Sequence, residues 1–175
     1  ITINATTGTG ASSSFVIPAN NGVATYNLNA ATGTKFSSVG SKSYTAVVVM
    51  DADLSGSAYD WAFNMIPERR LTSIASVAWA PGSSDKSVNY NPVWVTPSAA
   101  TTVYVKYDGN ITAGPNQSPA GAFYDVSYSV PALASKQIFG TGNDNSGMAV
   151  YNTDNIPMAM VWGQSSDLAS ISGVA

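Results

Sequence analysis

The stretch Thr101–Pro131, TTVYVKYDGNITAGPNQSPAGAFYDVSYSVP, decides the fold class of this chain. Its first arm alternates, with Val103 and Val105 on one side, and Tyr124–Val130 alternates in the same way. A period of two with β-branched and aromatic residues predicts half-buried strands. The segment between the arms, Asp108–Pro119, is rich in Gly, Pro and Asn and predicts an exposed loop. We therefore expect two adjacent strands joined by this loop.

The remaining sequence predicts further short strands separated by turn residues. Ser43–Met50 is the most continuous apolar run, and we expect it to be a central strand covered on both faces. Regular turn signals predict an all-β fold, specifically an antiparallel β-sandwich of jelly-roll type with about eight to eleven short strands. We expect one domain over residues 1–175, with Ile1–Thr6 and Ser165–Ala175 as candidate arms at interfaces with neighbouring copies.

The composition suits a surface that contacts copies of itself. Charged residues make up 10% of the 175 residues, against a usual share of about a quarter. The alternative is a secreted domain with a neutral polar coat. The net charge is −3 with seven basic residues, so any contact with nucleic acid must come from residues outside this sequence. The first residue is Ile1 rather than Met, and we expect a segment upstream of it.

Three acidic residues form the candidate metal site. Asp51 and Asp53 follow an expected strand, and Asp60 lies nearby in the sequence. Carboxylate oxygens are the ligands that calcium prefers, so calcium is the one cofactor that the sequence suggests. The pattern lacks the bidentate Glu that closes an EF-hand loop, and a capped strand end is the alternative interpretation.

Catalysis is not predicted. The chain has no His and no Cys, which removes the commonest general base and the thiolate nucleophile. Its one Glu, Glu68, is followed by Arg69 and Arg70, which favour an ion pair over a general acid. No G-x-S-x-G motif occurs, and no apolar run is long enough to cross a bilayer.

Two features of the sequence bear on glycans. The sequons Asn4, Asn110 and Asn116 are acceptors only if the chain passes through a glycosylating compartment. The chain also has many aromatic residues, four of them tryptophans, which could stack on sugar rings as in carbohydrate-binding modules. Most of these aromatic residues alternate correctly for a core face, so we expect core positions for them.

Two stretches resemble known families. SYTAVVVMDAD, residues 43–53, with WAFNMIP at Trp61–Pro67, resembles the phosphatidylethanolamine-binding fold, but the histidines that its ligand site requires are absent. GAFYDVSYSVPALAS, Gly121–Ser135, resembles the last jelly-roll strand of small icosahedral RNA virus coat proteins, and Val103–Gly109 matches the strand before it. The chain departs from that family in lacking a basic N-terminal arm and in continuing for about 40 residues past the last matching strand.

The second resemblance implies a structural subunit that assembles with copies of itself, most simply a capsid protein located in the virion. One alternative is a secreted or cell-surface filament subunit in which Ile1–Thr6 completes the sheet of the next copy. Another alternative is a carbohydrate-binding module.

Overall fold

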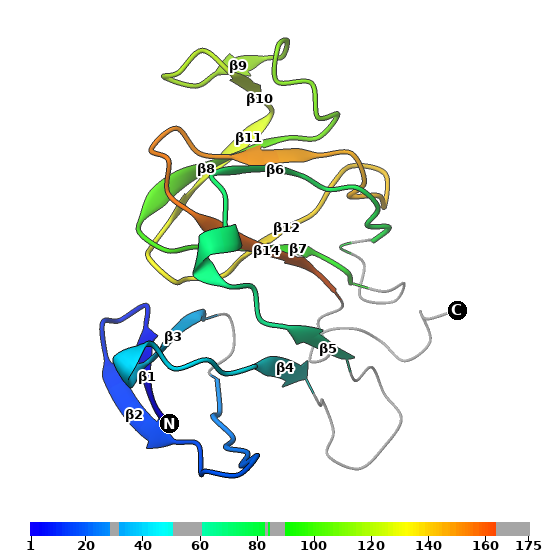
Figure 1. Ribbon diagram of the computed structural model, residues 1–175. Coiled ribbons are helices and arrows are strands. Elements are labelled where there is room, and N and C mark those ends of the chain that lie inside the picture. The colour runs from blue at the N-terminus through cyan, green and yellow to red at the C-terminus, as the bar shows by residue number, and fades with distance from the viewer. Residues whose placement is uncertain (29–31, 51–60, 83, 85–89, 164–175) are drawn as a thin grey trace.

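The computed structural model describes residues 1–28, 32–50, 61–82, 84 and 90–163 (Figure 1). The fold is all-β and antiparallel, as predicted, with two short 3-10 turns at Val39–Ser41 and Glu68–Arg70. The strands are β1 (Thr2–Thr7), β2 (Ser12–Val16), β3 (Thr34–Ser38), β4 (Val47–Met50), β5 (Trp61–Asn64), β6 (Ile74–Ser76), β7 (Val93–Pro97), β8 (Thr101–Lys106), β9 (Asn116–Gln117), β10 (Phe123–Tyr124), β11 (Val126–Val130), β12 (Lys136–Ile138), β13 (Ala149–Tyr151) and β14 (Met158–Trp162).

Two sheets form the sandwich. One has the strand order β11-β8-β13-β6 and the other has the order β12-β7-β14. The core between them consists of alternate residues of the facing strands, since side chains along a strand point to opposite faces. Its fully buried members are Val93, Val95, Val103, Val105, Val150, Ile138 and Met148.

The arms of Thr101–Pro131 form β8 and β11, and they pair antiparallel with Val105 opposite Val126 and Val103 opposite Tyr128. The predicted pairing is therefore confirmed. The other edge of β8 pairs with β13, which puts β8 in the interior of its sheet. This second partner comes from a segment more than forty residues later, and no local pattern reveals it.

A smaller sheet, β2-β1-β3, lies beside the sandwich (Figure 1). An aromatic cluster of Phe15, Tyr26 and Phe36 packs on it, with ring centroids 5.3–6.2 Å apart. Thr2–Thr7 is its central strand, with β2 on one edge and β3 on the other. Both edges of this candidate arm are thus already paired within the chain. Ser165–Ala175 lies outside the described residues.

The prediction that Ser43–Met50 is a covered central strand is wrong. Only Val47–Met50 forms a strand, and it pairs with β5 alone in a two-stranded sheet. Val47 and Val49 are 53% and 68% exposed. An apolar run predicts burial only on average. This run ends in a two-stranded sheet that no other described strand extends.

Strand β6, which follows the 3-10 turn at Glu68–Arg70, is short. It ends at Ser76, and Trp79, predicted to lie on a core face, is 71% exposed. Its ring packs edge-on against Trp162, whose indole N–H donates to the carbonyl of Pro81. Contact with a second tryptophan therefore replaces the core position that alternation predicted.

Candidate functional site

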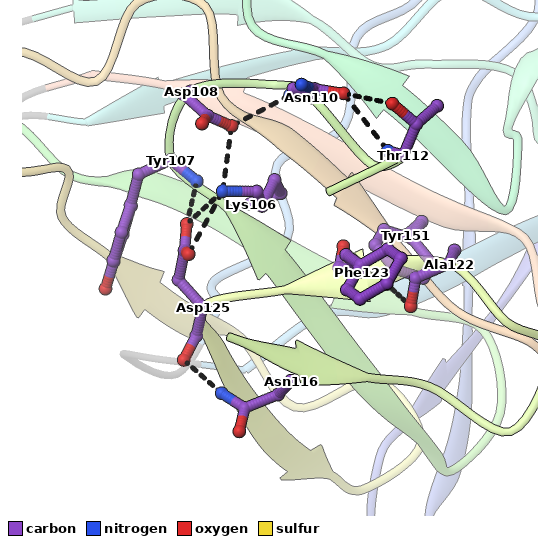
Figure 2. A network of polar contacts seen from close by, with 10 residues as sticks. All are labelled: Lys106, Tyr107, Asp108, Asn110, Thr112, Asn116, Ala122, Phe123, Asp125 and Tyr151. Atoms are coloured by element: carbon purple, nitrogen blue, oxygen red, sulfur yellow. Dashed lines mark hydrogen bonds and ion pairs between the residues drawn. The ribbon is translucent and has the colours of Figure 1, made fainter. Parts of the chain in front are cut away.

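A charged network lies where β8 ends (Figure 2). Lys106 is the last residue of β8 and its side chain is buried. Its Nζ lies 3.1 Å from Oδ1 of Asp125 and 3.0 Å from Oδ1 of Asp108. The backbone N–H of Tyr107 donates to Oδ2 of Asp125 at 2.8 Å. A buried cation is costly unless it is paired, and here two carboxylates meet that requirement.

The network continues into the loop after β8. Oδ1 of Asp108 accepts the N–H of Asn110 at 2.9 Å, and Oδ1 of Asn110 accepts both the N–H and the hydroxyl of Thr112 at 3.1 and 2.7 Å. Between them Gly109 has a φ of +71°, which favours glycine, and an added Cβ there would lie 2.3 Å from the carbonyl oxygen of Gly147. The loop is therefore fixed by several consecutive hydrogen bonds.

The loop leads to the β9–β10 hairpin, which projects beyond the sandwich at the top of Figure 1. The Asn116 side chain donates to the carbonyl of Asp125, and the Tyr151 hydroxyl donates to the carbonyls of Ala122 and Phe123. The Tyr104 ring lies 4.8 Å from that of Tyr124. These contacts attach the hairpin to the outer face of β8 and β13, so the projection has a defined orientation.

The protonation states of the network favour an anchor over a catalyst. The N–H of Asn110, followed by Lys106, lowers the pKa of Asp108, which keeps its carboxyl ionised. The Asp108 side chain, with Asp125, raises the pKa of Lys106. A general acid needs a raised carboxyl pKa and a nucleophilic lysine needs a lowered one, so both groups are shifted away from those roles.

The sequons fall in different places. Asn4 is exposed on β1, Asn110 is exposed in the loop after β8, and Asn116 is exposed at the start of β9. The amide oxygen of Asn110 is already used by Thr112, whereas Asn116 uses its amide nitrogen toward Asp125. Two of the three sequons therefore lie between β8 and β10, one in the loop and one on the hairpin.

The metal candidates Asp51, Asp53 and Asp60 lie outside the described residues. Among the residues that the structure describes, no three acidic side chains come together as a metal site would require. The calcium prediction therefore stays a prediction. In the same described part of the chain, no helix has the length and apolar character needed to cross a bilayer.

A depression of about 500 Å³ lies beside the edge of β12. It is lined by Trp94, Tyr128, Ser135, Lys136, Gln137 and Phe139. The Lys136 ammonium lies 4.4 Å from the centroid of the Tyr128 ring, a cation–π geometry. Tyr90 packs against Phe139 at 5.0 Å. The depression therefore brings three aromatic rings together with polar side chains around one space.

The sequence analysis did not identify the contacts of Lys106 with Asp108 and Asp125. One signal was present: alternation places Lys106 on the same face of β8 as Thr102 and Tyr104, where it is the only charged residue and requires an anion if it is buried. The sequence does not show which acid forms the ion pair, because Asp125 lies nineteen residues later and comes near Lys106 only in the folded chain.

Comparisons with known proteins identify no relative. No protein-family model matches the chain, and neither the curated proteins nor the solved structures include a significant match.

Proposed function

We propose that this chain is a structural subunit that assembles with copies of itself, and specifically a viral coat protein present in the virion. The observation that carries the proposal is the strand order of the sandwich. A jelly roll has eight strands wound as two Greek keys and is a common fold of viral capsid subunits. Its sheets run first-eighth-third-sixth and second-seventh-fourth-fifth along the chain.

The strand order of this sandwich fits that scheme at seven positions. With β6 taken as the second strand, β7, β8, β11, β12, β13 and β14 become the third to the eighth. One sheet then reads sixth-third-eighth, which is β12-β7-β14, and the other reads fifth-fourth-seventh-second, which is β11-β8-β13-β6. Both match without rearrangement. The scheme puts its first strand beside the eighth, and in the described part of the chain only Thr72, through a single bridge with Met158, occupies that side of β14.

Two further features support assembly. The chain has few charges, so lateral faces can meet with little repulsion or desolvation cost. The β9–β10 projection is held in place by the Lys106 network, which suits a loop that contacts a neighbour or the particle exterior.

The filament alternative has weaker support. Strand donation requires a free strand, and Thr2–Thr7 is paired on both edges. A carbohydrate-binding module is favoured by one observation, the depression lined by Trp94, Tyr128 and Lys136. A monomeric protein that binds glycans, and loses that binding when Trp94 is changed to Ala, would replace the assembly proposal.

Electron microscopy and analytical ultracentrifugation of the purified chain test the proposal. Closed shells or defined oligomers are expected at micromolar concentration. Fibres would favour the filament alternative. A protein that remains monomeric over a wide range of concentration and pH, both with and without added nucleic acid, would contradict self-assembly.

A further inference from the structure

Within the described residues, the outer edge of β14 is unpaired over most of its length. β14 pairs with β7 on one side, with Met160 opposite Val95 and Trp162 opposite Val93. On the other side, the N–H of Met158 donates to the carbonyl of Thr72 at 2.9 Å. Successive residues of an antiparallel strand direct their N–H and C=O groups to opposite edges. The backbone groups of Met160 and Trp162 therefore point to the same outer edge as Met158.

The hydrogen bonds at both ends of β14 agree with this assignment. Ser98 donates to the carbonyl of Pro157, and Gly163 donates to the carbonyl of Pro92, so the odd-numbered residues face β7. Among the described residues, none pairs with Met160 or Trp162 on the outer side. The outer edge thus offers two N–H and two C=O groups.

The chain itself is diverted from this edge. Thr72 lies opposite Met158, so an antiparallel strand would continue backward along β14 through residues 71–68. Instead Glu68–Arg70 forms a 3-10 turn, and Glu68 forms an ion pair with Lys35 of β3 at 2.5 Å. Pro67, which precedes the turn, has no N–H to contribute to a ladder. Local sequence and one ion pair together leave the position open.

β14 has the composition of an interior strand. Its sequence MAMVW is apolar on both faces and contains no charge, no Gly and no Pro. Edge strands are usually protected by charged residues, by Pro or by bulges. β12, at the opposite edge of the same sheet, carries Lys136 and Gln137. The edge of β14 therefore fits a strand that is itself uncharged.

We propose that this edge pairs antiparallel with β14 of a second copy of the chain, related by a two-fold axis beside Val161. The inference rests on the proposed self-assembly and names its interface. The edge is self-complementary, because the same uncharged strand provides both donors and acceptors. A two-fold contact of this kind is the commonest in homo-oligomers.

The position of Thr72 sets the register. Thr72 occupies the edge at Met158, so the register that uses the open groups of both remaining residues places Met160 opposite Trp162 of the partner subunit, and Trp162 opposite the partner's Met160. Each of these pairs exchanges two backbone hydrogen bonds. Val161 then faces the partner's Val161 in a non-hydrogen-bonded pair, for which the Cα atoms lie about 4.5 Å apart. The sheets β12-β7-β14 of the two copies become one continuous sheet.

Disulfide trapping tests this register directly. The chain has no cysteine, so Val161→Cys creates a single thiol. A Cα separation of about 4.5 Å lies within disulfide range, and the partner's thiol lies directly opposite. We expect a covalent dimer under mild oxidation, formed at least about ten times faster than for Val49→Cys. The control places the thiol on another exposed β-strand, where only random collisions cross-link it.

A pair of proline variants tests the hydrogen bonds without a thiol. Met160→Pro removes an outward N–H and leaves pairing with β7 intact, so we expect a folded protein by near-ultraviolet circular dichroism with at least about tenfold weaker dimerisation in ultracentrifugation. Val161→Pro removes an N–H that faces β7, and the expected result is loss of the folded spectrum.

The outcomes separate the inference from the proposed function. Defined oligomers of the unmodified chain, with Val161→Cys cross-linking no faster than Val49→Cys, would overturn this interface and leave self-assembly standing. Unchanged dimerisation of folded Met160→Pro would do the same. A protein that is monomeric throughout would overturn both. Rapid cross-linking of Val161→Cys together with weakened Met160→Pro dimers supports both.

Discussion

At the scale of single residues, Gly109 is the most constrained glycine of the loop that leads to the projection. Its φ of +71° is matched by Gly142, whose φ is also +71°. The difference is space: a Cβ at Gly142 would meet nothing within 4 Å, whereas one at Gly109 would lie 2.3 Å from the backbone of Gly147. The two positions therefore separate conformational strain from a steric clash.

Replacing each glycine with Ala measures that separation. We expect Gly142→Ala to lower the free energy of unfolding by about 1 kcal/mol, the usual cost of a left-handed backbone for a residue with a Cβ. Gly109→Ala should cost clearly more, because Gly147 must also move. Urea unfolding of both variants provides the comparison. Equal losses would mean that the loop shifts freely and that the projection is not rigidly attached.

The second prediction at this scale concerns Asp108 and pH. Because its folded pKa is lowered below 3.8, Asp108 stabilises the fold fully above that value and loses the contribution as the pH falls through the folded pKa. Asp108→Asn should therefore flatten the decline of stability in acid. Asp144, whose pKa is also lowered, by Ser146, is the control at a separate site. Chemical denaturation between about pH 2 and 6 measures the slopes, and identical slopes for wild type and Asp108→Asn would contradict the prediction.

The contribution of Lys106 to stability depends on pH in the opposite direction. Its folded pKa is raised above 10.5, so its contribution is complete below that value and disappears as the pH rises through the folded pKa. The network is thus intact throughout the neutral range, as an anchor requires.

At the scale of elements, β4 and β8 show that similar strands occupy different environments. Val103 on β8 is fully buried, while Val49 on β4 is 68% exposed. Both are valines in antiparallel strands, so the two can be compared with the same substitution.

Val103→Ala and Val49→Ala form this comparison. We expect Val103→Ala to lower the free energy of unfolding by about 2 kcal/mol, from the lost apolar contacts and the cavity left behind. Val49→Ala should change it by no more than about 0.5 kcal/mol. Thermal or urea unfolding distinguishes them. A loss at Val49 as large as that at Val103 would contradict the prediction and indicate that another copy covers β4. Repeating the unfolding of Val49→Ala at low protein concentration would then show whether the loss depends on assembly.

At the scale of the whole molecule, the low charge and the apolar edge of β14 predict assembly that depends little on salt. Between about 0.1 and 1 M salt the screening length falls from about 10 to about 3 Å, which removes most attraction between exposed charges. The assembled fraction should stay constant or rise over this range, since salting-out favours apolar contact. Sedimentation velocity measures that fraction, and dissociation at high salt would point to charge-driven contacts instead.

The sequence by itself determined the all-β class and the pairing of the Thr101–Pro131 arms. Period-two alternation and turn chemistry are local properties, and they act over a few residues. They also put Val103 and Val105 on the same side of the strand, and that side is the one that the structure buries. They failed at Ser43–Met50 and Trp79, because hydrophobicity says that a residue gains from burial without saying whether another element is available to cover it.

Only the tertiary structure decided the strand order, the acids that pair with Lys106 and the open edge of β14. β13 inserts beside β8, and Asp125 returns to Lys106, through contacts between residues far apart in the chain. Such contacts depend on how whole sheets stack, which no local pattern encodes. The open edge arises in the same way. The Lys35–Glu68 ion pair and the turn at Glu68–Arg70 direct the chain away from β14, so no other described segment pairs with Met160 or Trp162 on the outer side of a strand whose sequence suits the interior of a sheet.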